Sequence, residues 1–160
     1  MLYYHGTIHK TNVLEPGFNK TGKLEKFEDE ETNEFLYVTG KRSEAILQGF
    51  FSAAESMSNS VHGFSRFVAR SDGAKIIIES SNPMFDIDKV LGIPLYLYSF
   101  ESDYRDDLKP VLSKSNPHYP QHKTKKTIKA NRLTEEVIDL RKWAEFRIFR
   151  VKYVPHTTGT

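Results

Sequence analysis

A histidine and a glycine stand side by side near the start of the chain, in the segment Tyr3-Tyr4-His5-Gly6-Thr7. The apolar residues before them are typical of a short strand, which delivers the imidazole directly to a residue without a Cβ atom. Because glycine lets a ligand or another backbone approach the main chain closely, the pair predicts a strand edge at which a ligand is held. A histidine near a chain terminus is most often solvated or at the edge of the core, so the motif needs support from elsewhere.

A second segment gives that support. An aromatic run, Phe35-Leu36-Tyr37-Val38-Thr39, leads into a helix-like stretch that carries an alanine at position 45. In order and spacing, the two segments resemble the ADP-ribosyltransferase superfamily, in the branch whose active site is a His-Tyr-Glu triad. The spacing is most similar to diphtheria toxin and the small rifampin ADP-ribosyltransferases, and the similarity to poly(ADP-ribose) polymerases is looser. The resemblance implies an α+β fold with an ADP-ribosyltransferase-like split β-sheet core and a few short helices.

The resemblance also implies a role for each residue of the triad. His5 would bond a ribose hydroxyl of NAD, and the backbone of Gly6, followed by Thr7, would pair with the nicotinamide carboxamide. Tyr37 would stack on the nicotinamide ring, where aromatic stacking contributes about 0.5–1.5 kcal/mol beyond area burial. A glutamate late in the chain would offset the positive charge that develops when the nicotinamide–ribose bond breaks.

Three glutamates are candidates for that carboxylate. Glu136 opens the β-like run Glu136-Val137-Ile138-Asp139-Leu140, which a second β-like run follows after Trp143, and this layout is similar to the polymerases. Glu136 is therefore the first choice, Glu145 the second and Glu135 the third.

Two further residues complete the expected donor site. Ser43 is expected to cap the helix that follows the aromatic run, near the bound dinucleotide. Phe50, on the same helix, would form a second wall of the nicotinamide pocket, although aromatic residues at helical spacing are usually core.

The expected function is that of a mono-ADP-ribosyltransferase of the glycosyltransferase class, which moves ADP-ribose from NAD to an acceptor and releases nicotinamide. NAD serves as a co-substrate, and no metal is required. The acceptor stays open: a protein side chain, a nucleic acid, a small molecule, or water, which would make the protein an NAD glycohydrolase. A non-catalytic module that binds NAD, ADP-ribose or a protein is the alternative on the same fold. A tRNA 2′-phosphotransferase is disfavoured, because the arginines of that family have no counterpart near His5.

Composition agrees with a single domain over residues 1–160, since 160 residues with 38% hydrophobic content can build one core. The chain contains no cysteine, which excludes disulfides, thiolate zinc sites and a cysteine nucleophile. No apolar run approaches the roughly 20 residues that a membrane span needs, and no signal peptide is recognisable, so we expect a cytoplasmic protein.

The pattern of apolar and turn-forming residues predicts few helices and several short strands, which is the arrangement of an α+β fold. The expected strands cover residues 2–4, 34–39, 74–79, 93–100, 133–140 and 146–154, the helix covers 43–56, a loop covers 7–24, and a polar connection covers 103–109.

The net charge of +2 is unevenly distributed. An acidic cluster lies at residues 25–34, and a basic stretch without carboxylates begins at Lys114 and ends at Arg132. The basic stretch could contact nucleic acid or the NAD pyrophosphate, although charged loops are more often simply solvated. His118 and His122 have the spacing of metal ligands on a helix, but neighbouring prolines disfavour a helix, so no metal site is expected.

Overall fold

The computed structural model describes residues 1–17, 34–58, 67–72, 75–80, 87–111 and 121–143. For residues 54–58, 67–72, 75–80 and 87, it describes the backbone only. Among the described residues, no helix is long and apolar enough to cross a membrane.

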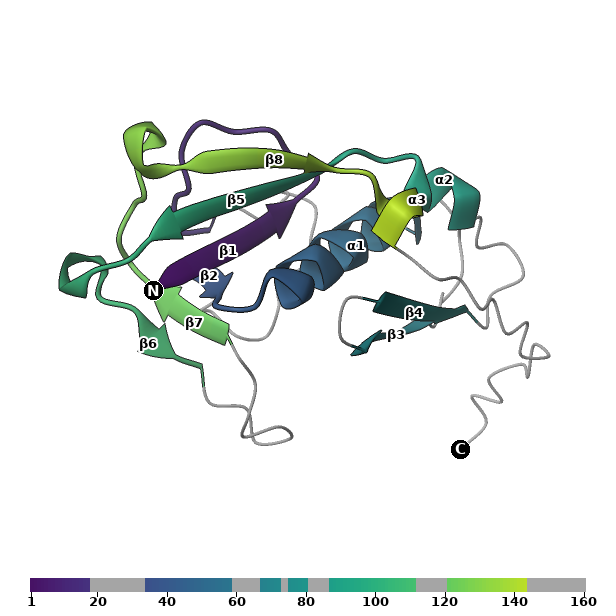
Figure 1. The fold of residues 1–160 in the computed structure, drawn as a ribbon, viewed down its shortest axis with the longest axis horizontal. Coiled ribbons are helices and arrows are strands. Elements are labelled where there is room, and N and C mark those ends of the chain that lie inside the picture. Colours follow the sequence, from purple (N-terminus) through teal and green to yellow (C-terminus); the bar gives the residue numbers. More distant parts are fainter. Residues whose placement is uncertain (18–33, 59–66, 73–74, 81–86, 112–120, 144–160) are drawn as a thin grey trace.

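The main structural element is an antiparallel sheet of six strands, in the order β6-β7-β2-β1-β5-β8 (Figure 1). The strands are β1 (Leu2–Thr7), β2 (Leu36–Thr39), β5 (Leu95–Glu101), β6 (Lys109–Pro110), β7 (Gln121–Thr124) and β8 (Thr134–Ile138). A separate hairpin joins β3 (Phe67–Asp72) to β4 (Lys75–Ser80). The helices are α1 (Arg42–Ser58), α2 (Ile87–Leu91) and α3 (Leu140–Trp143), with 3₁₀ turns η2 (Tyr104–Asp106) and η3 (Ala130–Arg132).

The first strand lies near the middle of the sheet, but its two sides are joined very differently. It pairs with β5 along its whole length, from Leu2 opposite Glu101 to Thr7 opposite Tyr96. Its register with β2 consists of a single pair, Tyr4 opposite Thr39. The sheet is therefore firmly joined on one side of β1 and joined at one point on the other.

One face of the sheet, here called the helix face, packs against α1. Ala45, Ile46 and Phe50 of the helix are buried in one cluster with Leu95 and Leu97 of β5. Burying such side chains supplies most of the stability of a helix of this kind.

The opposite face, here called the loop face, has a second core. Tyr3 and Val38 pack there with Tyr98 under Leu14 and Ile128, which belong to segments far apart in the chain. These two segments form an isolated bridge, with N–H to carbonyl bonds of 3.0 and 2.9 Å in the two directions. Because side chains alternate along a strand, the central strands β1 and β5 contribute to both cores.

The α+β class is confirmed, and so are the expected helix at 43–56 and most of the expected strands. The strand expected at 133–140 ends at Ile138, because Leu140 begins α3. The polar connection at 103–109 holds the 3₁₀ turn η2 and the start of β6. Residues 146–154, expected to form a strand, lie outside the described residues. The strands β3 and β7 and the helix α2 were not expected.

Candidate functional site

His5 and the Tyr37 segment, 32 residues apart in the chain, meet in the structure. The Nδ1 atom of His5 lies 2.7 Å from the carbonyl oxygen of Tyr37, which makes the imidazole the donor of a hydrogen bond through Nδ1. His5 is one residue beyond Tyr4 on β1, and Tyr37 is two residues before Thr39 on β2. The imidazole thus links the two strands beyond the single backbone pair that joins them.

The rings of His5 and Tyr37 lie on opposite faces of the sheet. His5 is paired with Tyr98, a residue of the loop-face core, and is 2% exposed. Tyr37 alternates with Leu36 and Val38, which point to the loop face, so its ring points to the helix face. The contact of His5 is therefore with the main chain of Tyr37.

Gly6 has a structural role that the sequence analysis did not foresee. A Cβ atom at this position would overlap the carbonyl group of Ala45, in the second turn of α1. The glycine and the alanine of the two motifs are thus neighbours, and the close packing of helix on strand explains the need for a glycine at position 6. Thr7 is also buried, and its Oγ1 accepts a hydrogen bond of 3.1 Å from the N–H of His9.

Glu136 lies on the helix face, in a row with Gly6 of β1 and Leu97 of β5. Its Oε1 accepts a hydrogen bond of 2.5 Å from Nη2 of Arg42, the first residue of α1. The Arg42 guanidinium also lies 4.9 Å from the ring centroid of Trp143. Gly6, Tyr37 and Glu136 therefore share one face of the sheet, and the start of α1 holds the carboxylate.

Glu135 lies on the opposite face, in a row with Tyr98 and His5. Its Oε2 accepts a hydrogen bond of 3.0 Å from the Tyr98 hydroxyl, and its Oε1 lies 3.4 Å from Nζ of Lys10. The Tyr98 hydroxyl accepts a hydrogen bond of 2.8 Å from the N–H of Thr11. Burial, reinforced by the neighbouring carboxylate, raises the pKa of Tyr98 to about 12, so the phenol stays protonated and orients Glu135.

The remaining predicted site residues are placed as follows. α1 begins at Arg42, so Ser43 lies inside its first turn. The prediction that Ser43 is the N-cap, the residue just before the helix, is therefore wrong. Phe50 is 1% exposed and belongs to the core against the sheet. Glu145 lies outside the described residues.

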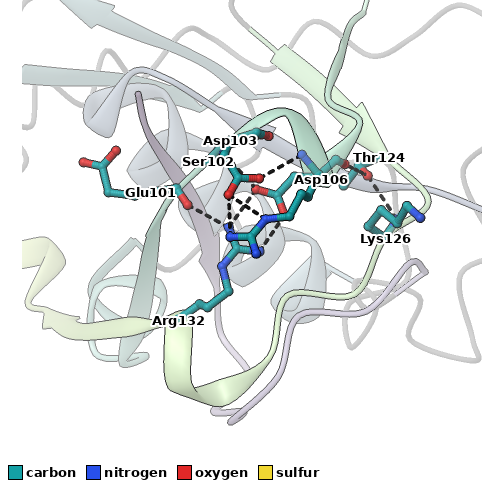
Figure 2. Close-up of polar contacts among 8 residues, drawn as sticks. Glu101, Ser102, Asp103, Asp106, Thr124, Lys126 and Arg132 are labelled. Carbon is teal, nitrogen blue, oxygen red and sulfur yellow. Dashed lines mark hydrogen bonds and ion pairs between the residues drawn. The ribbon is translucent and has the colours of Figure 1, made fainter.

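The end of the basic stretch forms an ion pair within the chain (Figure 2). Arg132 donates from Nη1 to Oδ1 of Asp106 at 2.5 Å and from Nη2 to Oδ2 at 2.7 Å, and Nη2 also reaches the carbonyl oxygen of Glu101 at 2.8 Å. The hydrogen bonds from Arg132 hold the pKa of Asp106 below its usual range. The hydroxyl of Thr124, at the end of β7, donates to the carbonyl oxygen of Asp106. Arg132 thus anchors η2, Thr124 ties β7 to the same turn, and the charge of Arg132 is matched by Asp106.

The roles of Arg42, Tyr98 and Asp106 could not be predicted from the sequence, because their partners lie 94, 37 and 26 residues away in the chain. Among the described residues, no group of three or more His, Asp or Glu side chains is arranged to hold a metal ion. His122 belongs to β7, and His118 lies outside the described residues. No protein-family model, curated protein or solved structure matches the chain.

Proposed function

We propose that the protein is an NAD-dependent ADP-ribosyltransferase. The observation that carries the proposal is the meeting of the His5 and Tyr37 motifs where β1 and β2 are joined by one backbone pair and one imidazole–carbonyl bond. Only one backbone pair joins β1 to β2 beside the His-Gly pair, and the proposal places the approach of NAD to the main chain of the glycine at this junction. The order of the motifs along the chain adds support from the sequence.

The proposed reaction begins with NAD bound where a single backbone pair joins β1 to β2. In this proposal His5 fixes the main chain of Tyr37 from the loop face through its Nδ1 bond, the backbone of Gly6 pairs with the carboxamide, and the ring of Tyr37 stacks on the nicotinamide. The bond between the nicotinamide nitrogen and the ribose C1′ breaks, and its electron pair leaves with nicotinamide. The acceptor then adds to C1′ and loses a proton.

Glu136 supplies the negative charge that the ribosyl cation needs in this proposal. It shares a face of the sheet with Gly6 and Tyr37, which favours it over Glu135. Its ion pair with Arg42 orients the carboxylate before NAD binds. Glu135 shares its face with His5 and is the competing assignment among the described residues, and Glu145 stays a candidate outside them.

Nicotinamide release from NAD, followed by chromatography, tests the activity. Glu136→Gln should leave NAD affinity nearly unchanged and lower turnover by about 10²–10³-fold or more, because the lost charge acts mainly in the transition state. Glu135→Gln is the matched control, with the same chemical change one residue away. A loss in the Glu135 variant alone would transfer the catalytic role to Glu135 and leave the reaction class intact.

Donor binding can be followed separately, because Trp143 is the single tryptophan of the chain and lies against Arg42, the partner of Glu136. Titration with NAD should change its fluorescence, and Tyr37→Ala should weaken the binding. Fluorescence that responds to NAD, with no nicotinamide released in the presence of any acceptor tried, would favour a non-catalytic binding module. Absence of both responses would contradict the proposal.

A further inference from the structure

Aromatic and basic side chains gather at the edge of the sheet formed by β2, β7 and β6. Lys109 is paired with Lys123, and Lys123 is paired with Tyr37, so these three residues form one row across the strands on the helix-face side. Phe35 lies beside Tyr37, with ring centroids 6.4 Å apart. We call this set, together with Lys125, the aromatic–lysine surface.

Two of the three lysines of this surface lie close to the ring of Phe35. Nζ of Lys123 is 4.5 Å, and Nζ of Lys125 is 5.4 Å, from the ring centroid of Phe35. Phe35, Tyr37 and Lys123 are partly exposed, and Lys109 and Lys125 are exposed. Aromatic rings and positive charges are therefore accessible to solvent side by side on this surface.

The ion pair of Lys125 is exposed to solvent. Glu34 lies 3.8 Å from Nζ of Lys125, but both side chains are more than 60% exposed, and ion pairs in that setting contribute little. Water and salt screen such a pair, so a phosphate can replace the carboxylate.

We infer that the aromatic–lysine surface binds single-stranded nucleic acid. Sheets that bind single strands without base pairing combine stacking rings with cations that follow the phosphate backbone. A row of lysines beside two adjacent rings has both parts, and the complementarity of charge favours a polyanion over a protein partner. The inference concerns binding alone and does not depend on the transfer of ADP-ribose.

Binding of a fluorescein-labelled single-stranded oligonucleotide, measured by anisotropy at several salt concentrations, tests the inference. If about three phosphates are contacted, the logarithm of the affinity should fall against the logarithm of salt with a slope of about −2. The double variant Lys109→Glu/Lys125→Glu should weaken binding by about tenfold or more and bring the slope closer to zero. The double variant Lys129→Glu/Lys142→Glu has the same change of charge at exposed positions elsewhere and should bind as the wild type does.

The aromatic part has its own variant. Phe35→Leu keeps an apolar side chain that preserves packing but removes the stacking surface, so affinity should fall by about fivefold or more. Thermal unfolding followed by circular dichroism verifies that each variant is folded.

Two results would overturn the inference. One is an affinity that is equal for the wild type and for the Lys109/Lys125 double variant. The other is loss of the NAD response of Trp143 fluorescence in that variant while the oligonucleotide still binds, because the surface would then serve the phosphates of the dinucleotide. Neither result depends on whether nicotinamide is released, so failure of the proposed enzymatic function is distinguishable from failure of this inference.

Discussion

Two arginine–carboxylate pairs, at different places in the fold, have the same chemistry and very different surroundings. Arg132 donates two hydrogen bonds to Asp106, and the aspartate side chain is only 3% exposed (Figure 2). Arg42 pairs with one carboxylate oxygen of Glu136, and the glutamate side chain is 52% exposed. Water therefore screens the second pair strongly and the first pair weakly.

The difference in exposure and bonding distinguishes a carboxylate that stabilises the fold from a carboxylate that is available for chemistry. A buried carboxylate that both accepts bidentate bonds and fixes a turn cannot change partners without disturbing the fold. An exposed carboxylate held by one bond can exchange that bond for a ligand at small cost. On this ground the Asp106 pair belongs to the scaffold, and the Glu136 pair is suited to a site.

The largest effect is expected for Asp106→Asn. The variant keeps the shape of the side chain but leaves the partly buried guanidinium of Arg132 without its counter-charge, and it weakens the capping of η2. Loss of one partner of a buried pair costs about 3 kcal/mol or more of unfolding free energy. Urea unfolding monitored by circular dichroism measures the loss, and a change below about 1 kcal/mol would show that Asp106 is no more structural than an exposed carboxylate.

The pH dependence of stability gives a second, smaller effect at the same residue. The pKa of Asp106 is lowered in the folded protein, whereas the unfolded value is about 4. Its stabilising contribution is therefore fully present above the unfolded pKa and is lost as the pH falls through the folded pKa. The wild type should lose more stability than Asp106→Asn between about pH 5 and pH 2, and parallel curves would contradict the assignment.

The sequence allowed the elements that carry apolar residues to be predicted. The runs at residues 74–79 and 93–100 are rich in β-branched or aromatic side chains, and both correspond to strands of the structure. β7, with the sequence Gln-His-Lys-Thr, shows no such signal, because its place in the sheet depends on pairing with β2 and on the anchor at Thr124. Polar strands of this kind are determined by tertiary contacts and not by propensity.

The candidate site was predictable in its parts but not in its arrangement. The resemblance of the two motifs to one family predicted that the His5 motif and the Tyr37 segment lie close together, and they do. The face on which each side chain lies depends on register, and a shift of one residue exchanges the two faces. Alternation along β8 puts Glu135 and Glu136 on opposite sides of the sheet. The pairing with β5 is needed to show that Glu136 is the one on the face of Gly6.

Tyr98→Phe is expected to have an intermediate effect. The ring keeps its packing, but the N–H of Thr11 loses its acceptor and Glu135 loses its donor. Groups left unsatisfied in this way cost about 1–2 kcal/mol. Denaturant unfolding measures the cost, with Tyr104→Phe as the control, since Tyr104 is 93% exposed and its hydroxyl is free to bond water. Equal stability of the two variants would show that the loop-face polar cluster is not structural.

The smallest effect is expected for Glu136→Gln, measured as stability and not as activity. Exposed ion pairs contribute about 0–1 kcal/mol, and at more than half exposure the lower part of that range applies. The urea midpoint should therefore stay close to that of the wild type, and the small difference should shrink further in high salt. A loss as large as that of Asp106→Asn would place Glu136 in the scaffold, and any accompanying loss of turnover would then reflect a damaged fold. Lost turnover can be assigned to the missing charge only if the variant unfolds like the wild type.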